Sequence, residues 1–339
     1  MSATFARLSR APAPCIRILR QNIHTTPTRA QRQPIPTTPT CPPPTCACAS
    51  TPPDLAIDRT SPLLNTVAAY ASQVVLCTGT SDWPSNIEQE GGATGEFVKG
   101  LKGIVGRGGE AFDPFNNVLI TASDIPASQT PNTTTALLFP AFKRIPVIPH
   151  SPSSYRAFAT AYLKAESLHP MHDGLSADQK AKLSRDESAA RILPQAEDIT
   201  TPTILICGHA TRDSRCGALG PLLQHSFEKE FARRGIDAHV AQISHIGGHK
   251  FAGNVIVYLP PAWGNALSGA GIWYGRVGPE SVEGLVGETV VGGRVVRDMV
   301  RGGRMAGGGD LGRGVEGMER EEKGEDGKGG LRLEPRDRR

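Results

Sequence analysis

Short apolar runs alternate with amphipathic stretches through the middle of the chain, and this alternation predicts two α/β units. Residues with a helical spacing of apolar side chains lie at 94–105, 153–166, 219–234 and 279–288. Apolar runs typical of buried strands lie at 74–78, 117–121, 135–140, 203–207, 239–243, 254–259 and 272–275. From residue 203 the elements follow the order β-α-β-β-β-α, which is close to a thioredoxin-like unit. The charged stretch 167–200, with a short helix expected at 176–192, is predicted to connect the two units.

Composition changes at both ends of the chain and sets the limits of these units. Residues 33–53 are rich in Pro and Thr and are predicted to form an extended linker. From residue 292 the sequence is rich in Gly, Arg and Glu, so a disordered tail is expected over 292–339. The predicted fold class is therefore α/β, with a smaller α/β domain at 54–195 and a thioredoxin-like domain at 196–291.

The distribution of charge separates the N-terminus from the rest of the chain. The first 53 residues contain six Arg, no Lys and no acidic residue. An acid-free, Arg-rich and Ser/Thr-rich N-terminus is typical of a mitochondrial transit peptide, predicted here at residues 1–32, and it favours the matrix over the intermembrane space. The remaining chain carries 31 basic and 33 acidic residues, which gives no electrostatic reason to expect nucleic-acid binding. No apolar stretch reaches the roughly 18–20 residues of a membrane span.

Two cysteines and two histidines of the second unit provide the candidate chemistry. Cys207 and Cys216 have a C-x8-C spacing, and His245 and His249 form an H-x3-H pair around two glycines. Thiolates and imidazoles together suit zinc or a 2Fe–2S cluster. Structural zinc sites usually place their paired cysteines closer together, which favours the cluster. On the residues alone, zinc, a redox-active dithiol and no site at all remain open.

Other candidate residues carry weaker predictions. Cys77 lies in an apolar strand and is expected to be a small buried hydrophobic residue. His209 follows Cys207 too closely to replace one of the two histidines. Three charged residues between the cysteines either tune the site or form an ordinary surface loop: Arg212, Asp213 and Arg215. The Pro/Thr-rich segment holds three cysteines whose function the sequence leaves open: Cys41, Cys46 and Cys48.

Three motifs resemble those of the fungal sucrase/ferredoxin-like family: CGHATRDSRCGALGPLL, HIGGHKFAGNVIVYLP and WYGRVGPE. The resemblance extends over roughly residues 40–292. The spacing is also similar to that of thioredoxin-like 2Fe–2S ferredoxins, with their second cysteine pair replaced by histidines. The resemblance thus implies a thioredoxin-like ferredoxin domain whose 2Fe–2S cluster is held by Cys207, Cys216, His245 and His249.

The function that the resemblance implies is that of a bis-histidinyl 2Fe–2S protein of the mitochondrion. Such a protein would act in one-electron transfer or redox sensing rather than convert a substrate, and its partner would be another redox protein of unknown identity. Because neutral imidazoles replace two thiolates, its potential should exceed that of an all-cysteine ferredoxin and can depend on pH. A thiol–disulfide oxidoreductase using Cys207 and Cys216 is one alternative, and a zinc-stabilised structural module is another.

Overall fold

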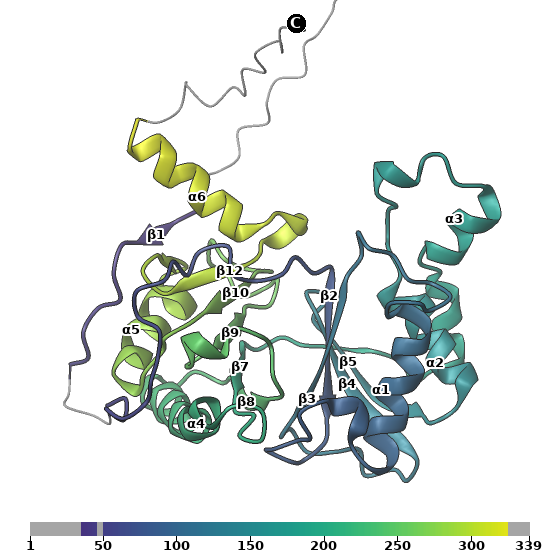
Figure 1. Cartoon of the computed structure of the whole chain (residues 1–339), viewed down its shortest axis with the longest axis horizontal. Helices are drawn as coiled ribbons and strands as arrows, with labels where there is room; N and C mark the ends of the chain where they lie inside the picture. The colour runs from purple at the N-terminus through teal and green to yellow at the C-terminus, as the bar shows by residue number, and fades with distance from the viewer. Residues whose placement is uncertain (1–34, 46–49, 325–339) are drawn as a thin grey trace, which may run out of the picture. The chain divides into compact units, whose positions relative to one another are not determined.

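The computed structural model describes residues 35–45 and 50–324, whose central feature is a mixed sheet of ten strands (Figure 1). Across the sheet the order is β12-β10-β9-β7-β8-β3-β2-β4-β5-β6. The prediction of a mixed α/β fold is confirmed. The predicted transit peptide (1–32) and two of the cysteines in question, Cys46 and Cys48, lie outside the described residues.

The first half of the sheet begins at a strand that the sequence predicts. Its elements are β2 (Ser72–Cys77), α1 (Gly92–Val105), β3 (Val118–Ser123), β4 (Thr133–Phe139), β5 (Lys143–Pro149) and α2 (Pro152–Phe158), which continues as a π-helix over Ala159–Leu163. The connection to the second half contains α3 (Ala177–Leu183) and β6 (Glu197–Asp198). The sequence pattern does not predict β5, because its two prolines are unfavourable in a strand. It lies near the edge of the sheet, where only the short β6 follows it.

The second half confirms the predicted β-α-β-β-β-α order. Its elements are β7 (Thr203–Cys207), α4 (Ser214–Arg234), β8 (His239–Ile243), β9 (Val255–Tyr258), β10 (Gly271–Tyr274) and α5 (Val282–Leu285), which is flanked by a 3-10 turn at Pro279–Ser281 and a π-helix at Val286–Val291. Strands β7 and β8 are parallel, whereas β9 is antiparallel to both β7 and β10. The strand order 8-7-9-10 follows from this pairing.

The two halves have the same topology. In the first half β2 and β3 are parallel, β4 is antiparallel to β2 and β5, and the strand order is 3-2-4-5. Cys77 pairs with Ser123 as Cys207 pairs with Ile243, so the two cysteines occupy equivalent positions. The chain therefore contains a tandem structural repeat, joined where β3 and β8 meet in antiparallel fashion at Ser123 and Ile243.

The inner faces of the two half-sheets pack against each other, and the helices cover the outer faces. Helices α1 and α2 pack on the first half, and α4 and α5 on the second (Figure 1). Between the halves, the rings of Phe139 and Tyr258, which are equivalent in the repeat, stack with centroids 4.0 Å apart. The Tyr258 hydroxyl donates to Gln73 Oε1 at 2.7 Å and pairs with the Tyr70 hydroxyl at 3.1 Å. Aromatic stacking and buried hydrogen bonds thus join the halves.

The prediction of a disordered tail from residue 292 is wrong up to residue 324. Three further elements follow there: β11 (Val295–Val296), β12 (Val300–Arg304) and α6 (Leu311–Glu322). Strand β12 pairs with β10 and extends the sheet, and its first three residues, Val300–Gly302, are buried. Gly303 has φ +142°, and a Cβ there would collide with the carbonyl oxygen of Gly271. The glycines that suggest disorder therefore permit close strand pairing.

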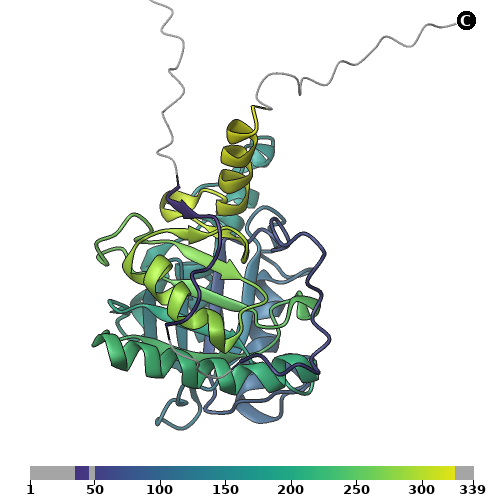
Figure 2. The same ribbon diagram turned by 90° about the vertical axis from the view of Figure 1, so that its left-hand side faces the viewer.

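The Pro/Thr-rich segment does not serve as a free linker where the structure describes it. Strand β1 (Thr37–Thr38) pairs in parallel with β11, and Figure 2 shows this segment running across the second half. The Thr45 and Thr51 hydroxyls each donate to a glutamate near α5, at 2.8 Å. Thr66, which belongs to the predicted first domain (54–195), accepts hydrogen bonds from Arg301 of β12 in the second half. Among the described residues, no helix combines the length and apolar character needed to cross a membrane.

Replacing Phe139 by Ala should destabilise the whole chain. The side chain is fully buried between the half-sheets, so its loss removes apolar contact and leaves a cavity worth roughly 3–5 kcal/mol. Phe112→Ala is the control, since Phe112 is 40% exposed and should cost less than about 1 kcal/mol. Urea unfolding followed by circular dichroism measures both, and equal losses would contradict the proposed contact between the halves.

Candidate functional site

Cys207 and Cys216 lie together at the end of β7 and the start of α4. Both are free and buried, with 1% and 0% of their surface exposed. The Cys207 backbone N–H donates to the Asn254 carbonyl at 3.0 Å, which holds the end of β7 against β9. Asp213 caps α4, because its side chain accepts from the Arg215 N–H. The sequence predicted a loop up to Cys216 and a helix from residue 219. Instead, the helix starts at Ser214 and places Cys216 in its first turn.

The two thiols form a coupled pair. Hydrogen bonding with Cys216 lowers the pKa of Cys207, and the His245 ring lowers it further, although burial opposes both effects. The pKa of Cys216 is raised, because its thiol is the donor to Cys207 and because it is buried. The partial positive charge of the α4 N-terminus also favours a thiolate here. This end of β7 is thus suited to carry negative charge on sulfur.

The histidine pair lies in the segment after β8. Gly247 and Gly248 have φ of +81° and +71°, so the backbone turns sharply between the two histidines. The ring centroids of His245 and His249 lie 5.6 Å apart. His245 interacts with Cys207, and its buried Nδ1 has no hydrogen-bond partner among the residues that the structure describes. His249 begins a short 3-10 helix (His249–Phe251) and is exposed. A buried ring nitrogen that lacks a partner beside two thiols fits a metal ligand.

His209 supports the histidine segment through a hydrogen bond with the backbone of His245. Its Nδ1 accepts the backbone N–H of His245 at 3.0 Å, so this nitrogen carries no proton. Its Nε2 then donates to the carbonyl of Trp83 at 2.6 Å. The tautomer is therefore defined by two backbone partners, one from each half of the sheet. In the sequence, His209 stands out only as a possible competing ligand. Its bridging role depends on Trp83, which lies far away in the sequence.

A second contact brings the first half of the chain to the site. The Asp82 carboxylate accepts from the backbone N–H and the hydroxyl of Thr211, the latter at 2.7 Å. The Trp83 ring packs edge-on against His209, with centroids 5.7 Å apart. The loop that follows β2 therefore covers the loop that follows β7.

Arg301 is a further site residue that sequence analysis missed, because it lies in the segment predicted to be a disordered tail. Its side chain is 2% exposed. Its Nη1 donates to the Gly247 carbonyl at 3.2 Å and to Asn254 Oδ1 at 2.7 Å. Asn254 in turn donates to the Gly248 carbonyl at 3.0 Å. The turn between the two histidines thus rests on a buried guanidinium.

The remaining sequence-predicted residues lie at the edge of the site or outside it. Arg215 and Asp213 form an ion pair at 2.8 Å, as in an ordinary surface loop, and Arg212 is exposed. Cys77 is buried, as predicted, and burial raises its pKa to about 12. Cys41 contacts the Ser281 carbonyl at 3.5 Å, near α5, and burial raises its pKa to about 12. Neither cysteine is among the contacts of the Cys207–Cys216 pair.

The donor set determines what the site can hold. Across residues 35–45 and 50–324, no three or more His, Cys, Asp or Glu side chains are grouped closely enough to hold a single metal ion. A 2Fe–2S cluster divides its four ligands between two irons, so the four need not converge on one point. Two coupled thiols and a histidine nitrogen without a partner fit such a group.

The four candidate ligands all lie in the part of the chain that matches a known protein family. Residues 63–302 match the sucrase/ferredoxin-like family. Altered inheritance of mitochondria protein 32 is 48% identical over 106 residues in Debaryomyces hansenii and 40% identical over 141 residues in Meyerozyma guilliermondii. The two alignments cover 31% and 41% of this chain, and 37% and 45% of those proteins. The chain thus matches less than half the length of either relative.

A solved structure is also similar to part of the chain. It is a thioredoxin-like [2Fe-2S] ferredoxin from Aquifex aeolicus, with 18% sequence identity and a TM-score of 0.22. The match covers 30% of this chain and 89% of the ferredoxin.

His209→Ala should lower the free energy of unfolding of the chain. The substitution leaves the His245 N–H and the Trp83 carbonyl without their partner, at roughly 1–3 kcal/mol for each buried group. His225→Ala, an exposed position on α4, is the control and should change stability by less than about 0.5 kcal/mol. Denaturant unfolding of the full chain measures the difference. Similar values for both variants would show that His209 does not bridge the halves.

Proposed function

This chain belongs to the sucrase/ferredoxin-like family, and we propose that it binds a 2Fe–2S cluster through Cys207, Cys216, His245 and His249 and acts in electron transfer or redox sensing. The observation that carries the proposal is that Cys207 interacts with Cys216 and with His245, whose buried Nδ1 has no hydrogen-bond partner within residues 35–45 and 50–324. Two sulfurs and an unpaired imidazole nitrogen from separate loops form a soft ligand set.

The protein residues would define the character of this centre. A 2Fe–2S cluster, when bound, supplies one-electron transfer. Cys207 and Cys216 provide negative charge on sulfur, and the neutral histidines provide none, which favours a higher potential than four cysteines. His249 is exposed, so the ring nitrogen that is not a ligand can exchange a proton with water. The Asp213 carboxylate interacts electrostatically with His249, and Lys250 is the residue after His249.

A mitochondrial location and a redox partner complete the proposal. The relatives' name refers to mitochondrial inheritance, and the acid-free, Arg-rich N-terminus is typical of a transit peptide. The matrix is favoured over the intermembrane space by the same N-terminal pattern. The partner would be another redox protein that exchanges electrons at this site.

A thiol–disulfide oxidoreductase is the second candidate. The lowered pKa of Cys207 beside a free Cys216 favours it, since a thiolate is the reactive form. The burial of both thiols opposes it, because a protein substrate would have to reach sulfurs that have almost no exposed surface.

Anaerobic purification separates the proposed cluster from its alternatives. The chain should contain about two irons and two acid-labile sulfides and absorb visible light. His245→Ala should lose most of the iron, whereas His225→Ala, at an exposed position on α4, should keep it. A colourless chain with one zinc would support the structural-module alternative. A metal-free chain that reversibly forms a Cys207–Cys216 disulfide would support the oxidoreductase.

His249→Cys should retain the cluster but lower its midpoint potential. A thiolate replaces a neutral imidazole, which adds negative charge and disfavours reduction. The pH dependence should also weaken, from at most about 59 mV per pH unit for one proton and one electron. Redox titration between about pH 6 and 10 measures both effects. A wild-type potential that is constant over this range would exclude proton coupling.

A further inference from the structure

Arg301 is buried, and no carboxylate of the described residues pairs with it. Its guanidinium contacts only uncharged acceptors: the Gly247 carbonyl, Asn254 Oδ1, and the hydroxyl and carbonyl oxygens of Thr66 at 3.1 and 2.9 Å. A buried cation is costly unless an opposite charge compensates it. Within the part of the chain that the structure describes, no carboxylate forms an ion pair with it.

Arg301 also interacts electrostatically with the two cysteines. Burial lowers the pKa of Arg301 to about 10, and the electrostatic influence of Cys207 and Cys216 opposes this decrease. The cysteines lie at the end of β7 and the start of α4, whereas Arg301 belongs to β12. Negative charge on these sulfurs stabilises the buried guanidinium, and the guanidinium stabilises that charge in return.

The guanidinium also supports the histidine turn. Gly248 has φ +71°, and a Cβ at this position would collide with the Arg301 guanidinium, so the turn lies directly against it. Phe251 lies just after His249 in the chain, and its ring centroid is 5.6 Å from the Arg301 Cζ. Removing Arg301 would withdraw a donor from the Gly247 carbonyl between the two histidines.

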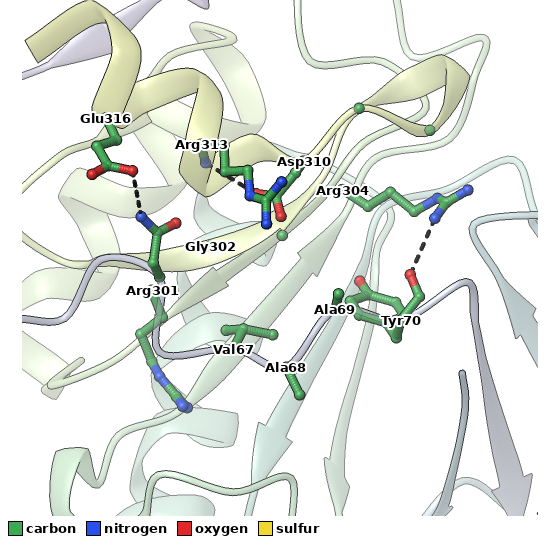
Figure 3. A pocket seen from close by; sticks show the side chains of 14 residues that line it. Val67, Ala68, Ala69, Tyr70, Arg301, Gly302, Arg304, Asp310, Arg313 and Glu316 are labelled. Atoms are coloured by element: carbon green, nitrogen blue, oxygen red, sulfur yellow. Dashed lines mark hydrogen bonds between the residues drawn. The ribbon is translucent and has the colours of Figure 1, made fainter. Parts of the chain in front are cut away.

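The Arg301 side chain has a different orientation from those of Arg304 and Arg313, which line the same cavity. This cavity, of about 360 Å³, is lined by β12, α6 and the segment around Val67. Figure 3 shows the side chains that line it. The Arg301 guanidinium points away from Arg313 of α6, and the Arg304 side chain extends in another direction, towards Tyr70 (Figure 3). Arg304 instead donates to the Tyr70 carbonyl at 3.1 Å. Arg304 therefore provides a control on the same strand.

We propose that Arg301 is a positioning residue for the 2Fe–2S site, whose fixed positive charge raises the cluster's reduction potential and whose hydrogen bonds hold the turn between His245 and His249. This inference rests on the proposed function. Reduction adds an electron to the site, and a buried cation nearby stabilises that added charge.

Potentiometric titration of the reconstituted full-length chain tests the charge. Arg301→Gln should lower the equilibrium constant for reduction about tenfold, which corresponds to about 59 mV for a one-electron couple. Arg301→Lys keeps the positive charge, so its equilibrium constant for reduction should stay within about threefold of the wild-type value. It should nevertheless lose iron faster in the presence of a chelator, because Lys lacks the guanidinium fork. Arg304→Gln, the matched loss of charge, should leave the potential unchanged.

Thr66→Asp provides a second route if Arg301→Gln does not fold. A carboxylate at this position would face the guanidinium and neutralise it while Arg301 stays in place, so the potential should fall in the same direction. Equal potentials in wild type, Arg301→Gln and Thr66→Asp, with iron and sulfide intact, would overturn this inference alone. A wild-type chain that holds no iron and sulfide would overturn the proposed function and this inference together.

Discussion

The face-to-face packing of the two half-sheets, centred on Phe139 and Tyr258, is the contact on which the candidate site depends. It brings the loop after β2 against the loop after β7, so that Trp83 and Asp82 reach His209 and Thr211. His209 can then accept the His245 N–H with one ring nitrogen while the other is satisfied. The site is therefore formed by both halves, although all four proposed ligands come from the second.

Local pattern predicted the elements whose burial is evident in a short window of sequence. The strands Thr203–Cys207 and His239–Ile243 have the predicted bounds, because a continuous or alternating apolar run in a central strand needs no distant information. Strand β5 was missed because prolines disfavour an interior strand and are tolerated near an edge. Without β5, the predicted first half has only two of the three consecutive strands that follow its first helix. The repeat was therefore not evident from the sequence.

The candidate site was predictable only in part, for a similar reason. Residue type and spacing single out Cys207, Cys216, His245 and His249 as possible ligands. Spacing alone does not reveal that Asp213 caps a helix through Cys216, because Gly217 and Pro221 are poor helix formers within the same turns. The role of Arg301 depends on partners far away in sequence. The apolar residues around it are sparse and become buried only by pairing with β10 and packing against the N-terminal segment.

The position of β12 at the edge of the sheet also has a consequence for the order in which the molecule is completed. A chain is synthesised from its N-terminus, and earlier parts begin to fold before later parts are available. The four proposed ligands precede Arg301, so the sulfur and imidazole groups are present before the guanidinium that supports the histidine turn. Until β12 pairs with β10, the thiol pair lacks its compensating cation. Assembly of the proposed centre would thus be a late event that depends on folding of the segment whose composition most resembles a tail.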